Sequence, residues 1–218
     1  MAPARIIGEH EKGAARAELL RFIAACYYQP CAEFAEEGLF DSMLDAATRI
    51  DPHLAAHARR LGEQFCAEGI ENLLLDYTRL FLGPTHVIAK PYGSVWLTGE
   101  GGLMQDSTMA VLELYEEGGF EMDGEFRELP DHIAAELEFL YLLLFRENEA
   151  HRTGDAGAAS AIADLRKRFF DQHLGRWVGP FTAAVTAGAQ SLFYRELAEL
   201  TGRCVTMEAS AGAATLRP

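Results

Sequence analysis

Residues 130–148, PDHIAAELEFLYLLLFREN, carry the strongest structural signal in the chain. Their apolar side chains recur at spacings of three and four, which places them on one wide face of an α-helix. The members of this face are Ile133, Leu137, Leu140, Tyr141 and Leu144. Pro130 and Asp131 favour a helix start, because an aspartate carboxylate accepts the unpaired backbone N–H groups of a first turn. The pattern predicts a helix over residues 131–148 at the centre of the protein.

Helical periodicity continues through most of the remaining sequence, where leucine and alanine far outnumber the β-branched residues that strands favour. Aspartate before proline at 51–52, glycine before proline at 83–84 and paired glycines at 118–119 are typical of helix boundaries. We therefore expect an all-α protein, a compact bundle of about nine to ten helices. The expected helices span residues 14–28, 33–48, 52–67, 70–81, 104–117, 131–148, 156–172, 176–187 and 191–200.

An acidic segment with two glycines, residues 119–130, separates two groups of helices and is typical of a hinge. We expect an N-terminal helical subdomain over residues 14–118 and a smaller C-terminal subdomain over residues 131–203. Residues 1–13 and 204–218 contain few large apolar side chains and are expected to be disordered tails. A hinge between helical subdomains permits either a monomer or a domain-swapped dimer.

Composition excludes several functional classes. The formal net charge of -14 disfavours nucleic-acid binding, which depends on Lys and Arg, and it favours a cationic partner, although the same charge also keeps a protein soluble. The N-terminal residues lack the apolar centre of a secretory signal, which predicts a cytoplasmic location. The apolar run of residues 139–145 is far shorter than the roughly 20 residues that a transmembrane helix needs. We expect no direct membrane insertion.

Catalytic motifs are absent from the sequence. It contains no pattern typical of a catalytic serine, a phosphate-binding loop or a dinucleotide-binding turn, so we expect no enzymatic activity. His132 and Glu136 lie four residues apart and could share a metal ion on one helix face. Metal sites in helical bundles usually take further Glu and His ligands from partner helices, and the sequence does not offer them. A helical-bundle metalloprotein using His132 and Glu136 stays the alternative function.

Residues 76–84, DYTRLFLGP, form an amphipathic turn that stops abruptly at a glycine and a proline. Aromatic residues at helical spacing usually face a core. Core packing and ligand binding are therefore both open interpretations of this segment.

Five segments together resemble the TorD/DmsD family of molybdoenzyme-maturation chaperones, in order and in spacing. They are residues 77–84 (YTRLFLGP), 91–97 (PYGSVWL), 106–108 (DST), 128–132 (ELPDH) and 193–200 (FYRELAEL). The resemblance covers roughly residues 15–202. It departs from the family pattern at Leu129, because relatives often place proline directly after the glutamate. This departure leaves the local path of the hinge open.

The resemblance implies an all-α fold and a cytoplasmic chaperone that binds a molybdopterin oxidoreductase precursor. Such chaperones bind the twin-arginine signal peptide and the apo form of the enzyme, and they delay its export until the cofactor is inserted. The resemblance implies no cofactor of the chaperone's own, although weak GTP binding has been proposed within the family. Carried over by position, the peptide-binding residues would be Tyr77, Leu80, Phe81, Tyr92, Trp96, Glu128, Asp131 and His132.

The residues themselves fit this interpretation. A twin-arginine leader combines a basic region with an apolar region, so its receptor needs carboxylates beside aromatic and aliphatic side chains. The acidic segment before residue 131 and the aromatic residues of the first two segments offer both chemistries. A third interpretation, a switch that binds GTP at the hinge, has little support, because a chain of this charge without a phosphate-binding loop is a poor receptor for polyphosphate.

Overall fold

The computed structural model describes residues 8–83, 87–97, 106–122 and 127–214. These residues form eleven α-helices and one π-helical turn, with a single isolated β-bridge between Tyr92 and His132. The helices are α1 (Glu9–Ala25), α2 (Glu33–Glu36), α3 (Leu39–Ile50), α4 (Pro52–Glu68), α5 (Ile70–Tyr77), η1 (Thr78–Leu82), α6 (Gly93–Leu97), α7 (Asp106–Glu117), α8 (Ile133–Thr153), α9 (Ala156–Gln172), α10 (Leu174–Gly188) and α11 (Leu192–Ala214). The prediction of an all-α bundle is confirmed.

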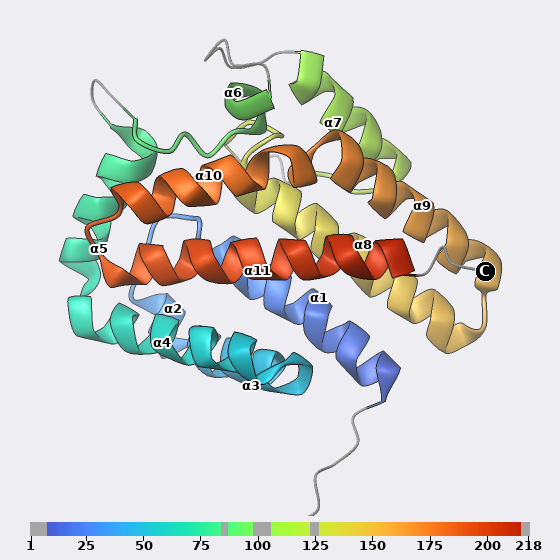
Figure 1. The fold of residues 1–218 in the computed structure, drawn as a ribbon, viewed down its shortest axis with the longest axis horizontal. Helices are drawn as coiled ribbons and strands as arrows, with labels where there is room; N and C mark the ends of the chain where they lie inside the picture. Colours follow the sequence, from blue (N-terminus) through green and yellow to red (C-terminus); the bar gives the residue numbers. More distant parts are fainter. Residues whose placement is uncertain (1–7, 84–86, 98–105, 123–126, 215–218) are drawn as a thin grey trace, which may run out of the picture.

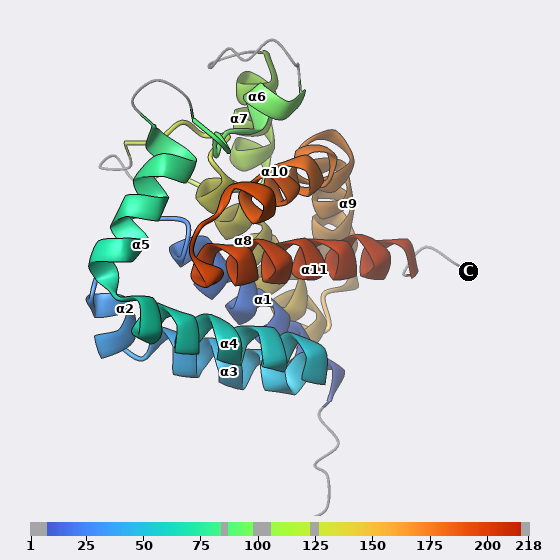
Figure 2. The same ribbon diagram turned by 60° about the vertical axis from the view of Figure 1, so that its left-hand side comes forward.

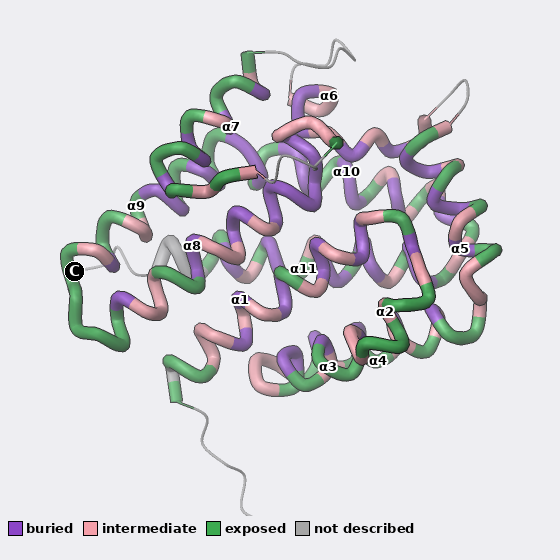
Figure 3. The backbone as a smooth tube through the Cα atoms, turned by 180° about the vertical axis from the view of Figure 1, so that it is seen from behind, coloured by how far each residue is buried: buried purple, intermediate pink, exposed green. Residues whose placement is uncertain are grey.

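The helices stack from one end of the molecule to the other. Figures 1 and 2 show α3 and α4 at one end and α6 and α7 at the opposite end, with α11 between α4 and α10. Helix α8 runs through the middle and makes its most extensive contact with α1. Most residues in the first three turns of α8 are buried, and Figure 3 shows the buried stretches of its backbone in purple, seen from behind. The central position predicted for this helix is correct.

Helix boundaries follow local capping chemistry where the sequence predicts it. Asp51 accepts hydrogen bonds from the backbone N–H groups of His53 (2.7 Å) and Leu54 (3.3 Å), and Pro52 begins α4. Helix α8 continues to Thr153, beyond the predicted end at residue 148, and Gly154, with φ of 76°, ends it in the left-handed region that glycine adopts without strain. Asp155 then caps α9 by accepting from Ala158 N–H at 2.9 Å.

One hydrophobic core crosses the boundary that we expected between two subdomains. Helix α1 packs on α8 and α4 packs on α11, so both expected units contribute to the same buried cluster. The described ends of the predicted hinge are attached to α8. Arg146 donates to the carbonyl oxygens of Gly118 and Gly119, and Phe120 packs on Phe139 with 5.7 Å between ring centroids. Residues 123–126 of the predicted hinge lie outside the described residues, and hinge motion stays a prediction.

The two segments predicted to be disordered tails are partly helical. Helix α1 already begins at Glu9, and α11 continues to Ala214. The C-terminal extension is stabilised because Cys204, Val205 and Glu208 are buried, and Glu208 pairs with Arg16 of α1 through an Nε–Oε1 hydrogen bond of 2.7 Å. Sequence reasoning missed this because the ion pair joins residues at opposite ends of the chain.

In the described part of the chain, no helix combines the length and the apolar character that crossing a bilayer requires.

Candidate binding surface

The turn η1 continues α5 with a wider, π-helical backbone, and two of its large side chains, Leu80 and Phe81, point into the core. Leu80 is fully buried and Phe81 is 4% exposed. The ring of Phe81 lies among four other rings, those of Tyr27, Tyr77, Phe181 and Tyr194. Tyr77 is also mostly buried, and burial together with the charge of Glu128 raises its pKa to about 12. Tyr77, Leu80 and Phe81, which we predicted to be peptide-binding residues, are therefore packed in the core, and their part in binding stays a prediction.

Two polar residues of the same segment fix η1 to the start of α11. The Asp76 carboxylate accepts from the backbone N–H groups of Gln190 (3.0 Å) and Ser191 (2.8 Å). Arg79 donates to the Gly188 carbonyl oxygen at 2.6 Å and to Asp76 at 2.5 Å. These contacts give structural roles to the two charged residues near Tyr77. Sequence reasoning did not assign these roles, because Gly188 and Ser191 lie more than a hundred residues away from Arg79 and Asp76.

The backbone at residues 91–93, where α6 begins, is hydrogen-bonded to the backbone at residues 131–133, where α8 begins. Gly93 N–H donates to the Asp131 carbonyl oxygen at 2.8 Å, and Ile133 N–H donates to the Pro91 carbonyl oxygen at 2.8 Å. The Asp131 carboxylate, which is fully buried, accepts from Ser94 N–H at 2.7 Å. Asp131 therefore stabilises the first turn of α6 rather than that of α8. The sequence-based assignment of Asp131 to the start of α8 is wrong because a tertiary partner replaces the local one.

His132 takes the capping role that we expected of Asp131. Its Nδ1 accepts from Ala134 N–H at 3.2 Å, and its ring is stacked on Tyr28 (centroids 6.3 Å apart, 13° between planes). The Tyr92 ring meets it edge-on at 5.4 Å. Burial lowers the pKa of His132 to about 3, so the imidazole is neutral near pH 7.

Two tyrosine–carboxylate pairs lie on the outer side of His132. Tyr92 donates its hydroxyl hydrogen to Glu128 at 2.5 Å, and Tyr28 donates to Glu138 at 2.8 Å. All four side chains are half-buried, so solvent reaches them. We call the set Tyr28, Tyr92, Glu128 and Glu138 the acidic–tyrosine surface.

The charges of this surface influence one another. Burial and the Glu138 carboxylate raise the pKa of Tyr28, and burial and the hydrogen bond to Glu128 raise that of Tyr92. Burial also raises the pKa of Glu138. A cation bound here would interact favourably with the carboxylates of Glu128 and Glu138. Tyr28 and Glu138 were missed by sequence reasoning, although an acid that interrupts the apolar run of α8 is a signal that could have identified Glu138.

Trp96 is half-buried but belongs to a different contact. Its indole N–H donates to the Lys90 carbonyl oxygen at 2.8 Å, and its ring meets Phe181 at 6.2 Å. Trp96 thus holds α6 on the core rather than contributing to the acidic–tyrosine surface. Of the acidic residues expected to precede residue 131, Asp123 and Glu125 lie outside the described residues.

Glu136 and His132 have different partners. The Glu136 carboxylate is fully buried, accepts from the Trp177 indole N–H at 3.1 Å and lies 3.6 Å from Nδ1 of His173. Burial raises the pKa of Glu136, which favours its neutral form. Within the described ranges no third ligand joins His132 and Glu136 to form a metal-binding group. The alternative metal site predicted from sequence is therefore not assembled among the residues that the structure describes.

Comparisons with known proteins place this fold in a functional context. The sequence profile of the family described as nitrate reductase delta subunit matches residues 47–183. The chain is 27% identical over 166 residues to the Tat proofreading chaperone DmsD of Salmonella typhimurium, an alignment covering 76% of this chain and 80% of the relative. It is 26% identical over 183 residues to the chaperone protein TorD of Shewanella loihica, covering 81% of this chain and 80% of that protein.

A solved structure shows the same fold. A candidate redox enzyme maturation protein from Archaeoglobus fulgidus superposes with a TM-score of 0.50 at 19% identity, covering 95% of this chain and 98% of that one.

Proposed function

The chain belongs to the nitrate reductase delta subunit family and is a maturation chaperone rather than an enzyme, and from this premise we propose that it binds a twin-arginine leader. The leader would be that of a molybdopterin oxidoreductase precursor. The chaperone would hold the precursor in the cytoplasm until its cofactor is inserted. The observation that carries the proposal is the acidic–tyrosine surface, where two carboxylates lie beside two aromatic rings.

The chemistry of this surface suits arginine. A guanidinium group donates to carboxylates in a planar fork and stacks on aromatic faces. Each tyrosine hydroxyl occupies one oxygen of its carboxylate, and a carboxylate can accept about four hydrogen bonds, so Glu128 and Glu138 retain acceptor capacity. A partly exposed contact of this kind contributes about 1 kcal/mol, and two arginines provide several such contacts.

The apolar part of a leader needs a different surface from the one predicted. Leu80 and Phe81 are buried, but Leu75 of α5 and Leu82 of η1 are 72% and 52% exposed. They lie on the helical segment that also carries Tyr77, whose pKa responds to Glu128. We assign the apolar region of the leader to this pair of leucines.

The experiment is calorimetric titration of the chaperone with a synthetic leader that carries two arginines before an apolar stretch. We expect the double variant Glu128→Gln/Glu138→Gln to bind about tenfold or more weakly, because two carboxylates are lost. Glu37→Gln, which removes an exposed acid beyond the end of α2, should bind as the wild type does.

A second leader, with lysines in place of both arginines, locates the contact. If the carboxylates bind the guanidinium groups, the replacement should weaken binding to the wild type more than to the double variant. Equal losses in both proteins, or an unchanged affinity of the double variant, would show that the leader binds elsewhere.

A further inference from the structure

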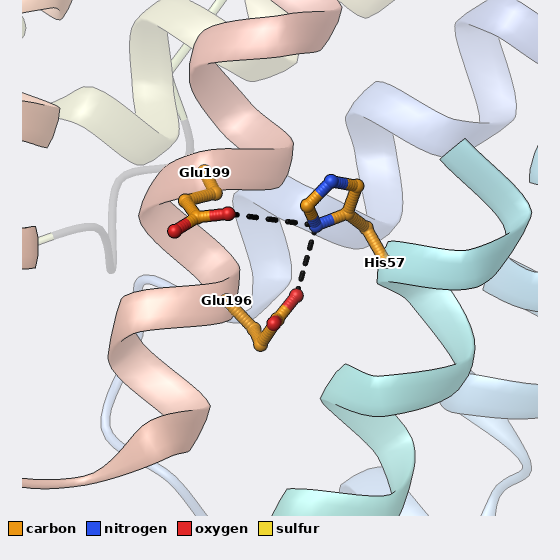
Figure 4. A group of neighbouring side chains, drawn as sticks. All are labelled: His57, Glu196 and Glu199. Carbon is orange, nitrogen blue, oxygen red and sulfur yellow. Dashed lines mark hydrogen bonds and ion pairs between the residues drawn. The ribbon is translucent and has the colours of Figure 1, made fainter. Parts of the chain in front are cut away.

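A histidine of α4 faces two glutamates of α11 on the side of the bundle away from α6. Figure 4 shows His57 pointing from α4 toward Glu196 and Glu199, which lie three residues apart and so share a face of α11. Sequence reasoning missed the group because His57 and Glu196 are 139 residues apart. The late segment of residues 193–200 contains both glutamates, and the leader-binding proposal gives them no role.

The three side chains offer one ligand atom each at metal-binding separations. Nδ1 of His57 lies 2.9 Å from Oε2 of Glu196 and 3.9 Å from Oε2 of Glu199, and all three atoms lie within 4.8 Å of one another. In a tetrahedral site with bonds of about 2.0–2.1 Å, neighbouring ligand atoms are about 3.3 Å apart. The two separations from Nδ1 bracket that value, so small side-chain movements bring the ligands into place.

The hydrogen bonds of His57 conflict with one another. Its Nδ1 lies 2.9 Å from a carboxylate oxygen of Glu196, which needs a hydrogen on that nitrogen. The same Nδ1 lies 2.9 Å from Nη2 of Arg60, which needs a lone pair there. One ring nitrogen cannot donate and accept at once, so one of these contacts is unfavourable in either tautomer. A metal ion bound to Nδ1 and to the carboxylates would remove the conflict.

We propose that His57, Glu196 and Glu199 form a binding site for a divalent transition metal of the zinc class, which links α4 to α11. One imidazole nitrogen and two carboxylate oxygens suit such an ion, with the remaining position left for water. Arg60 is the internal competitor, because its Nε donates to Oε1 of Glu196 at 2.8 Å.

The Arg60 side chain can move away from Glu196 when the ion binds. It is 43% exposed, and Glu63, one turn further along α4, is exposed and already acts on its charge. The site also has access to solvent, since Glu199 lines a groove of about 1040 Å³ between α10 and α11. An ion can therefore enter without the bundle opening.

The test is a metal titration of the full chain after treatment with a chelator. Cobalt(II) reports the coordination geometry through its visible absorption, and zinc is added in competition to give its affinity. The site predicts one ion per chain with a nitrogen–oxygen environment. His57→Gln and Glu199→Gln should each weaken zinc binding at least about tenfold. Because the Glu199 side chain is 48% exposed, its replacement by glutamine leaves the packing intact.

Two further variants make the result specific. His53→Gln removes an exposed histidine one turn earlier on α4 and should bind zinc as the wild type does. Arg60→Gln removes the competing cation and should bind zinc several-fold more tightly. A structural ion pair predicts no such gain. Unchanged zinc affinity in His57→Gln or Glu199→Gln, or weaker binding in Arg60→Gln, would overturn the proposal.

Discussion

Aromatic side chains have two different roles in adjoining regions of this molecule. In η1, Phe81 contacts four other rings and is almost fully buried. At the acidic–tyrosine surface, Tyr28 and Tyr92 remain half-buried and direct their hydroxyl groups to carboxylates. The difference is in the polar partner: an aromatic ring whose hydroxyl meets a solvent-accessible acid marks a surface that can bind a cation, whereas aromaticity alone marks the core.

The strongest test of this contrast removes a core side chain from η1. Leu80→Ala should lower the free energy of unfolding by about 3 kcal/mol, because a fully buried leucine leaves a cavity. Denaturant unfolding measures the loss. The folded fraction should still bind the leader with nearly wild-type affinity. A stable variant that no longer binds the leader would instead return Leu80 to the binding surface.

A second test uses pH to separate His132 from the residues around it. The pKa of His132 is lowered to about 3 in the folded protein, so this residue adds stability that is complete above about pH 6.5 and is lost as the pH falls. Between pH 7.5 and 5.5 the loss should be about 1 kcal/mol. His132→Asn keeps a side chain that can cap α8 but cannot titrate, so its stability should fall less over the same range.

The comparison for His132 is the difference between the two unfolding curves at each pH. This difference cancels the titration of Glu136 and Glu138, whose raised pKa values affect both proteins. Parallel curves for wild type and variant would mean that the imidazole is not held neutral by burial.

The smallest effect is expected at the surface itself. Tyr92→Phe removes the hydrogen bond to Glu128 but keeps the ring, so unfolding should change by less than about 1 kcal/mol. Leader affinity should fall by about threefold, because Glu128 loses the hydroxyl that orients its carboxylate. Calorimetry with the twin-arginine leader measures this affinity. A larger effect on stability than on affinity would assign Tyr92 to the core along with Phe81.

Local sequence signals predicted the helices well, while contacts between distant residues determine which side chains form the candidate binding surface. The cap at Asp51 and the helix ends before Gly83 and Gly118 depend on neighbouring residues, and these agree with the sequence pattern. Asp131 looks like a cap for α8 but is used by Ser94 of α6, so the helix starts two residues later. Tyr28 could not be assigned, because its partner Glu138 is 110 residues away.

The pair formed by Arg16 and Glu208 bears on the order of events during synthesis. The two residues are 192 positions apart and join the first helix to the last. At about 5–20 residues per second, a ribosome takes about 10 to 40 s to cover that distance. During this time α1 has no ionic partner from α11, and the groove between α10 and α11 does not yet exist. The bundle can therefore close around α1 only after α11 has been made.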